Sequence, residues 1–232
     1  MNKSIIIEFT WIYWAWKSTF LKQIKEKLND TDIIYFCDDF WDWFFKDFDT
    51  FYLNQNFFKK AFSRLLNIFK NIKLHFYFFV IAYKSKSIKL FNNLSYIKYK
   101  YDKKIIKENK VIIFDEFIFH KIIRKTSFLN INNREKIILN ILKFFDINPI
   151  YFDIDRSTSL ERLKNRKRKN SDFDNLSFDE KKELVEENYI IYKKIVKKYC
   201  EMNWKNFIII ESNNDINLNI EKFKKYLDIL KK

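Results

Sequence analysis

The sequence predicts an α/β fold in which helices cover both faces of a parallel sheet. Short apolar runs alternate with longer segments of helical spacing along the 232 residues, and this alternation is typical of parallel sheets. Near the N-terminus an apolar run, a loop ending in Lys-Ser-Thr and a helical pattern follow one another. That strand–loop–helix order is the context of a phosphate-binding loop. No internal repeat or linker divides the chain, so we expect one domain over residues 1–232.

Five short apolar runs are predicted to be buried strands. They cover residues 5–10, 33–36, 111–114, 150–154 and 207–211. The second run ends in Asp38-Asp39, the third ends in Asp115-Glu116, and Pro149 is expected in a turn before the fourth.

Segments with helical spacing are predicted between these strands. They cover residues 17–28, 56–83, 133–145, 159–169, 178–199 and 219–230. The apolar stretch 74–83 is too short to span a bilayer and is expected to be a buried helix. Residues 84–104, rich in lysine and asparagine, are expected to form a loop or short helices. The apolar start lacks a small-residue cleavage site, which argues against a signal peptide, and nothing in the sequence requires a membrane.

Glycine is absent, whereas tryptophan occurs six times. Three tryptophans stand where the glycines of a G-x-x-G-x-G-K-S-T loop would be, and the others lie where a turn glycine would fit. The six positions are Trp11, Trp14, Trp16, Trp41, Trp43 and Trp204. We interpret them as glycines of the native protein, encoded by a UGA codon that is read here as tryptophan. The alternative is a tryptophan-rich chain with a degenerate loop.

The net charge of +15 comes with heavy use of Lys, Asn, Ile, Phe and Tyr, as in an AT-rich coding sequence. Lysine on solvated faces explains the charge, although a polyanionic partner such as nucleic acid stays open as the rival interpretation. Cys37 and Cys200 fit no metal or redox spacing and are expected to be reduced thiols of a cytoplasmic protein.

The first candidate site is the loop and the turn after it. With glycines restored, backbone N–H groups would surround the phosphates, Lys17 would neutralise their charge, and the Ser18 hydroxyl would bind Mg²⁺. Asp115 with Glu116, at the tip of a buried strand, would hold the same ion directly or through water. The alternative for this pair is a loop carboxylate or helix cap.

Two further groups could act on a phosphoryl group or its acceptor. Arg162 and Arg166 are four residues apart in a predicted helix and share a face, where they could clamp a transferring phosphoryl group or form a solvated basic face. Asp38 and Asp39 could accept a proton, orient a sugar, or form a turn. His75 and His120 show no ligand or triad pattern.

With the glycines restored, IEFTWIYWAWKSTFLKQI resembles the opening of the thymidylate kinase-like group of P-loop nucleoside and nucleotide kinases. VIIFDEFIFHKIIR resembles the third strand of that family, YFDIDRSTSLERLKNRKRKNSD its fourth strand and arginine-bearing lid, and FIIIESNNDIN its last strand and adenine loop. The resemblance implies a three-layer P-loop NTPase fold with a five-stranded parallel sheet of order 2-3-1-4-5. It places a helical, arginine-bearing lid at about residues 156–176, with Arg162 and Arg166 acting in catalysis together with Lys17.

The resemblance also implies ATP and Mg²⁺ as cofactors. It assigns ATP to the loop and to the segment after the last strand, namely to Trp11, Trp14, Ala15, Trp16, Lys17, Ser18, Thr19, Ser212 and Asn213. Arg64 and Arg124 match acceptor-binding positions, to which we add Asp38 and Asp39. The family usually carries Asp-Arg after the third strand and an acidic-Arg-Pro turn after the second, and both are absent here.

We therefore expect phosphoryl transfer from ATP to a small acceptor, with a nucleoside monophosphate such as dTMP favoured. The alternatives are a deoxynucleoside kinase, a P-loop ATPase in which Glu116 orients water, and a basic nucleic-acid-binding module. No membrane partner is expected, and a homodimer is left open.

Overall fold

The computed structural model describes residues 4–11, 17–28, 33–36, 65–103, 110–115, 117–127, 129, 131–164 and 177–231. Several predicted site residues lie outside these ranges, namely Trp14, Ala15, Trp16, Asp38, Asp39, Arg64, Glu116 and Arg166. The side chains of Trp11, Lys17, Ser18 and Arg162 are likewise outside the described part, although their backbones are within it.

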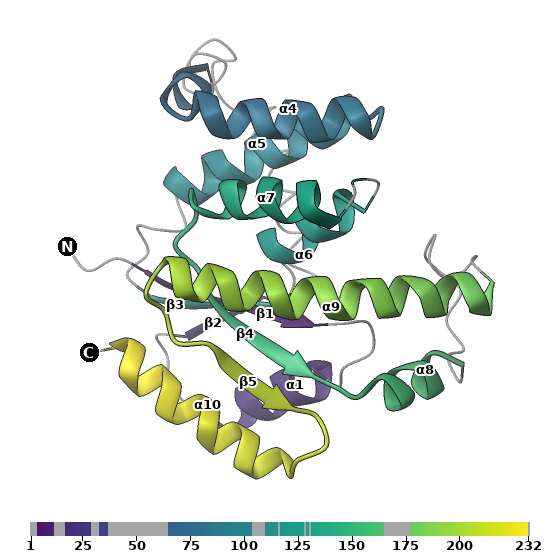
Figure 1. Ribbon diagram of the computed structural model, residues 1–232. Coiled ribbons are helices and arrows are strands. Elements are labelled where there is room, and N and C mark those ends of the chain that lie inside the picture. Colours follow the sequence, from purple (N-terminus) through teal and green to yellow (C-terminus); the bar gives the residue numbers. More distant parts are fainter. Residues whose placement is uncertain are drawn as a thin grey trace, which may run out of the picture.

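Five strands form one sheet, and every pairing between them is parallel. The strands are β1 (Ile5–Trp11), β2 (Ile33–Phe36), β3 (Val111–Phe114), β4 (Asn148–Asp153) and β5 (Ile208–Glu211). Their order is β2-β3-β1-β4-β5 (Figure 1). The α/β class and the parallel sheet are thus confirmed, and the order is the one that the resemblance implies.

Helices lie on both faces of the sheet (Figure 1). The described helices are α1 (Lys17–Lys27), α4 (Ile72–Lys84), α5 (Ile88–Lys103), α6 (Ile118–Lys125), α7 (Ile131–Leu142), α8 (Arg156–Lys164), α9 (Phe178–Met202) and α10 (Ile216–Lys231). Helices α1 and α10 cover one face, α6 and α9 cover the other, and α4, α5 and α7 stack outside the second layer.

Alternate residues of β1 point to opposite faces, as the two-residue period of a strand requires. Ile6 belongs to the core beneath α6 and α9, whereas Ile7 and Phe9 belong to the core beneath α1 and α10. The rings of Phe9 and Phe152 meet edge to face at 5.1 Å. A sheet buried on both faces explains why the strands read as continuous apolar runs.

The lysine- and asparagine-rich segment is a helix, so the expectation of a loop or short helices is wrong. Helix α5 buries Leu90, Leu94, Ile97 and Tyr101, whose spacing of three and four residues marks one helical face. The Lys98 ammonium donates to Asp102 and to the Phe144 carbonyl. The high lysine content suggested a loop, although the apolar residues of the segment have the spacing of a helix.

Pro149 lies inside β4 and not in a turn before it. Proline lacks a backbone N–H, which restricts it to strand positions that need no donor on one side. The pairing of β4 with β5 begins only at Ile150, so that Pro149 is flanked by β1 alone. The strand therefore begins earlier than its apolar run suggests.

Helix α4 forms as predicted, but only one of its faces is buried. Leu74, Phe78 and Ile81 are in the core, whereas Phe76 and Phe79 are largely exposed. The expectation of a buried helix over residues 74–83 is therefore half wrong. Within the described residues, no helix has both the length and the apolar character needed to cross a membrane.

Helix α9 ends in a turn that favours glycine. Trp204 has a φ of 54°, the Lys205 N–H donates to the Cys200 carbonyl at 2.9 Å, and the Trp204 N–H donates to the Glu201 carbonyl at 3.5 Å. These two bonds define a Schellman motif whose left-handed residue is usually glycine. The Trp204 side chain is 98% exposed and therefore adds nothing to the core. The geometry fits the interpretation of Trp204 as a native glycine.

Candidate functional site

The candidate site lies where the parallel strands end and the loops to the next helices begin. In open α/β sheets this carboxyl edge is where ligands bind. Strand β1 occupies the centre of the sheet, between β3 and β4. Its last residue, Trp11, is followed six positions later by Lys17, the first residue of α1.

Helix α1 presents the turn Lys17-Ser18-Thr19 at this edge. No acidic residue occurs in its first turn, and Thr19 is exposed. The free N–H groups and the positive end of the dipole make such a helix start attractive to anions. Phe20 and Ile24 are fully buried on the sheet, so that the helix start is held firmly at the end of β1.

Asp115 is the acidic group beside this turn. It directly follows β3, the neighbour of β1, and is only 5% exposed. The register pairs Glu8 with Phe114, and Asp115 is therefore one residue beyond the paired part of β3. The structure thus brings Asp115 and the start of α1 to the same edge from adjacent strands.

Glu8, inside β1, fixes the segment that follows Asp115. One carboxylate oxygen accepts the Phe117 and His120 N–H groups at 3.0 and 3.1 Å. The other accepts the Ile118 and Phe119 N–H groups at 3.1 and 3.0 Å. These are the donors that a helix start leaves unsatisfied, and Glu8 satisfies all four for α6.

The Glu8 side chain is completely buried. Burial raises its pKa to about 7, whereas the four N–H donors act in the opposite direction. The sequence patterns used for prediction did not identify Glu8, although it is the one charged residue of its strand. A single acid in a buried strand could have indicated its role, because such a group needs hydrogen-bond donors around it.

The other half of the edge is built by the ends of β4 and β5. The Asp153 carboxylate accepts the Lys193 ammonium at 2.7 Å and the Tyr189 hydroxyl at 3.3 Å, both from α9. The Ser212 N–H donates to the Asp153 carbonyl at 2.9 Å. Ser212 is buried and Asn213 is exposed, so that only Asn213 offers its side chain to solvent.

Asp155 caps α8, the helix of the predicted lid. Its carboxylate accepts the Thr158 N–H at 2.8 Å and the hydroxyls of Ser157 and Thr158, both at 2.5 Å. The Asn213 side chain donates to the same carboxylate at 3.3 Å. These bonds hold the pKa of Asp155 well below its usual value. Helix α8 begins three residues after the end of β4 and therefore starts at the carboxyl edge. It contains Arg162.

One predicted site residue, Arg124, lies away from this edge. Arg124 is exposed in the last turn of α6, at the opposite end of that helix from Asp115. His75 is between α4 and α5, within 3.0 Å of the Ser95 hydroxyl, and burial followed by the charge of Lys98 lowers its pKa to about 4. His120 is also in the core, 2.9 Å from the Tyr192 hydroxyl. Both histidine rings are thus buried beside a hydroxyl group.

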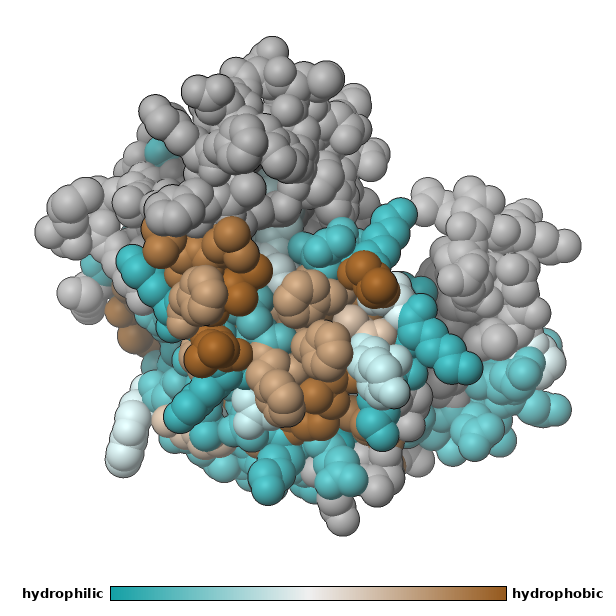
Figure 2. Space-filling model, turned by 90° about the horizontal axis from the view of Figure 1, so that it is seen from above, coloured by the Kyte–Doolittle hydropathy of each residue, from teal (hydrophilic) through white to brown (hydrophobic). Residues whose placement is uncertain are grey.

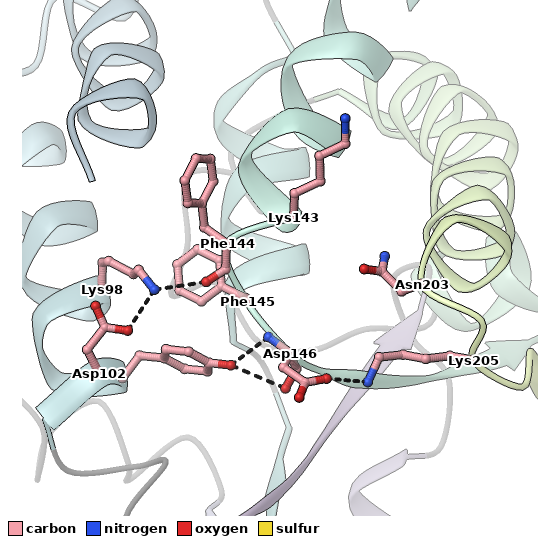
Figure 3. Close-up of a pocket in the computed structure, with 9 residues that line it drawn as sticks. Lys98, Asp102, Lys143, Phe144, Phe145, Asp146, Asn203 and Lys205 are labelled. Carbon is pink, nitrogen blue, oxygen red and sulfur yellow. Dashed lines mark hydrogen bonds and ion pairs between the residues drawn. The ribbon is translucent and has the colours of Figure 1, made fainter. Parts of the chain in front are cut away.

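A pocket of about 320 Å³ lies at the opposite, amino edge of the sheet (Figure 3). Two of its three lysines point to acidic partners: Lys98 donates to Asp102, and Lys205 to Asp146. Within the described residues, no group of three or more His, Cys, Asp or Glu side chains could hold a metal ion.

No protein-family model matches this chain, and no curated protein matches it.

Proposed function

We propose that this protein is a P-loop kinase with the fold of that class, which transfers the γ-phosphoryl group of ATP to a nucleoside monophosphate such as dTMP. The observation that carries the proposal is the pairing of two features on adjacent strands. A helix starting with Lys17-Ser18-Thr19 follows the central strand β1, and the buried Asp115 directly follows the neighbouring strand β3.

The described residues fit Mg²⁺·ATP in part. The start of α1 suits a polyphosphate, and a strand-end carboxylate such as Asp115 suits Mg²⁺. Indole rings do not suit a loop that must close around phosphates, since even a Cβ is costly where φ is positive. The proposal therefore concerns the chain with glycine at positions 11, 14 and 16.

In this chain the protein contributes positioning and charge, because phosphoryl transfer needs little covalent help. ATP supplies the phosphoryl group. Lys17 would offset the negative charge of the phosphates, Ser18 and Asp115 would orient the metal, and Arg162 would stabilise charge from the lid. Glu8 would keep Asp115 in place by anchoring the backbone that follows it.

Binding of Mg²⁺·ATP by calorimetry, compared between the printed and the glycine-restored chains, tests the loop. We expect binding by the restored chain and far weaker binding by the printed one; equal affinities would refute the steric argument. In the restored chain, Lys17→Ala should abolish turnover without lowering the melting temperature. Lys22→Ala, an exposed lysine of the same helix, is the matched control and should leave turnover unchanged.

An acceptor screen on the restored chain tests the reaction. Turnover that depends on dTMP supports the proposal, ATP hydrolysis without an acceptor supports an ATPase, and salt-sensitive binding of nucleic acid without turnover supports the binding module. Arg162→Ala and Arg166→Ala should lower kcat more than they raise the KM for ATP. An effect on KM alone would limit these arginines to substrate binding.

The choice between nucleotide and nucleoside acceptors depends on Asp38 and Asp39. A nucleoside hydroxyl profits from a general base, whereas a monophosphate needs cations that offset repulsion between phosphates. We expect Asp38→Asn and Asp39→Asn to retain substantial kcat, and Arg64→Ala or Arg124→Ala to raise the acceptor KM. An essential aspartate together with a preference for thymidine over dTMP would establish a deoxynucleoside kinase instead.

A further inference from the structure

Three residues join the sheet to α8, the helix that contains Arg162. They are Asp153, which ends β4, and Ile154 and Asp155, which lead directly into the helix. In the fold, β4 leads into α8, and α9 packs against both (Figure 1). We call residues 153–155 the α8 joint, because the direction in which α8 leaves the sheet is determined there.

One side of the α8 joint is bound to the first turn of α8 and to the segment after β5. The Asp155 carboxylate accepts the Thr158 N–H at 2.8 Å and the Asn213 side-chain amide at 3.3 Å. Ile154, in the middle of the joint, is 1% exposed and belongs to the core. The joint is therefore packed as well as hydrogen-bonded.

The other side of the α8 joint is bound to α9. One carboxylate oxygen of Asp153 accepts the Lys193 ammonium at 2.7 Å, and the other accepts the Tyr189 hydroxyl at 3.3 Å. Tyr189 and Lys193 are four residues apart on α9 and share a face. The Lys193 ammonium also lies 5.9 Å from the ring centres of Tyr151, in β4, and of Tyr189, an arrangement that attracts a cation.

This attachment is stronger than that of a single surface ion pair. An isolated exposed pair constrains two segments only weakly. Here each oxygen of one carboxylate has its own donor, and a two-point, charge-assisted attachment restricts the orientation of the partners as well as their distance. The Asp153 side chain is 21% exposed, so that it is also partly shielded from water. The end of β4 and the middle of α9 are thereby fixed relative to one another.

Helix α8 depends on such polar bonds. Among the side chains of α8 that the structure describes, Ser159 is the buried one and Leu160 is partly buried. The most extensive packing of this helix is with α9. Apolar side chains gather instead at the end of the molecule that carries α4, in one patch with hydrophilic ones around it (Figure 2). How α8 lies against α9 therefore follows largely from the bonds of the α8 joint.

We propose that Asp153 and Lys193 are positioning residues for the phosphoryl transfer, because their bond holds α9 against the α8 joint and so fixes the orientation of the helix that supplies Arg162. Neither side chain touches a reacting atom, and both act through α8. The catalytic part of this inference rests on the proposed function. The hold on α8 is a property of the folded chain by itself.

Hydrogen exchange of the α8 amides in the full chain tests the hold on α8 without any ligand. Lys193→Met removes the ammonium and keeps most of the side-chain length. Lys194→Met is the matched control: Lys194 is 43% exposed against 40% for Lys193, and its ion pair joins α9 to Glu135 of α7 instead. We expect the α8 amides to exchange roughly two- to fivefold faster in Lys193→Met, and at the wild-type rate in the control. Equal α8 exchange in the two variants would overturn the proposal.

Steady-state kinetics of the glycine-restored chain test the positioning role. Lys193→Met and Asp153→Asn should lower kcat roughly two- to fivefold and leave the KM for ATP unchanged, because the α8 arginine acts chiefly in the transition state. Lys193→Arg, which keeps a cation for Asp153, should retain most of the wild-type kcat. An increase in KM alone, or a Lys193→Arg variant as slow as Lys193→Met, would contradict this role.

A double variant tests whether Lys193 acts through Arg162. If it does, Lys193→Met should slow Arg162→Ala no further, since the group that it positions is already gone; additive losses would overturn the proposal. Two further outcomes separate this inference from the proposed function. Wild-type turnover in Lys193→Met, with fast α8 exchange, would refute the positioning role and leave the kinase intact. A restored wild-type chain that turns over no acceptor would refute both, and the exchange data would then describe a purely structural joint.

Discussion

The helices α6 and α8 both begin at the carboxyl edge of the sheet, and a carboxylate accepts backbone N–H groups at each start, four at α6 and that of Thr158 at α8. For α6 the carboxylate comes from Glu8, more than 100 residues earlier in the chain, and is completely buried. For α8 it comes from Asp155, the residue immediately before the helix. The two caps thus differ in reach. Asp155 lies two residues after the end of β4 and caps the helix that follows it, whereas Glu8 of β1 holds the helix start that follows β3.

The pKa values of the two carboxyl groups are shifted in opposite directions. Burial raises the pKa of Glu8, and hydrogen bonds to Ser157 and Thr158 lower that of Asp155. Glu8 caps its helix from within the core, where desolvation disfavours its charged form, whereas Asp155 caps its helix at the surface and keeps its hydration. The part of the site that holds Asp115 is consequently the part whose integrity depends most on a single buried group.

Replacement of Glu8 should have the largest effect. In Glu8→Ala all four N–H groups lose their acceptor. Leaving buried donors without acceptors costs roughly 3 kcal/mol or more. Chemical denaturation should show this loss, and Glu26→Gln on the exposed face of α1 should change the free energy of unfolding by less than about 0.5 kcal/mol. Equal effects of the two variants would refute the role of Glu8 as the anchor.

The pH dependence of stability should separate Glu8 from other acids. Glu8 holds its proton up to about pH 7 in the folded chain, whereas an unfolded glutamate releases it near 4.5. Between these values the folded state binds more protons, so the Glu8 contribution to the free energy of unfolding is present below pH 4.5 and is lost as the pH rises through 7. The loss is of the order of 3 kcal/mol. Subtracting the profile of Glu8→Gln from that of the wild type isolates it, and a flat difference would contradict the raised pKa.

The end of α9 extends the comparison to a position where the backbone conformation favours glycine but the residue is tryptophan. Trp204 has a left-handed backbone that costs a residue with a Cβ roughly 1–2 kcal/mol. We expect Trp204→Gly to raise the free energy of unfolding by about that amount, and Trp204→Ala, which keeps the Cβ, to raise it much less. Lys86 ends α4 in the same motif with a φ of 50°, so Lys86→Gly should give a similar gain. A gain from alanine equal to that from glycine would attribute the effect to the indole and not to the backbone.

The codon interpretation has its own measurement. Mass spectrometry of the protein expressed in its source organism should show glycine at position 204 and at the five other tryptophan positions. Tryptophan at these six positions in the native protein would sink the interpretation.

The local features could be predicted from the sequence, and the long-range ones could not. Strands β2 and β3 appear at their predicted bounds, because a short apolar run of this kind has few alternative structures. The turn Lys17-Ser18-Thr19 begins α1 as expected. Glu8 was overlooked because its partners are 109 to 112 residues away, and no pattern in a strand announces which helix start it will meet.

Predictions made from amino-acid composition were wrong where the spacing of apolar residues would have given the right structure. Lysine and asparagine suggested a loop over residues 84–104, although Leu90, Leu94 and Ile97 already have helical spacing. The apolar stretch of α4 suggested complete burial, because the sequence does not say that a second layer is missing on one side. Helix α6 was not predicted at all, since its start is completed by a residue of another element.

Replacement of Asp155 should have the smallest effect and the opposite dependence on pH. Asp155→Ala removes the cap of α8 and the link to Asn213, while Asp155→Asn keeps an oxygen for the Thr158 N–H, and asparagine is as good a cap as aspartate. We therefore expect a modest loss for alanine and almost none for asparagine, best seen as faster hydrogen exchange of the first α8 amides. Because the folded pKa is lowered, the contribution of the charged Asp155 is present at neutral pH and is lost as the pH falls below its unfolded value of 3.8. Should Asp155→Ala destabilise the chain more than Glu8→Ala does, the local cap would be the stronger anchor. The carboxyl edge would then be held together from its β4 side.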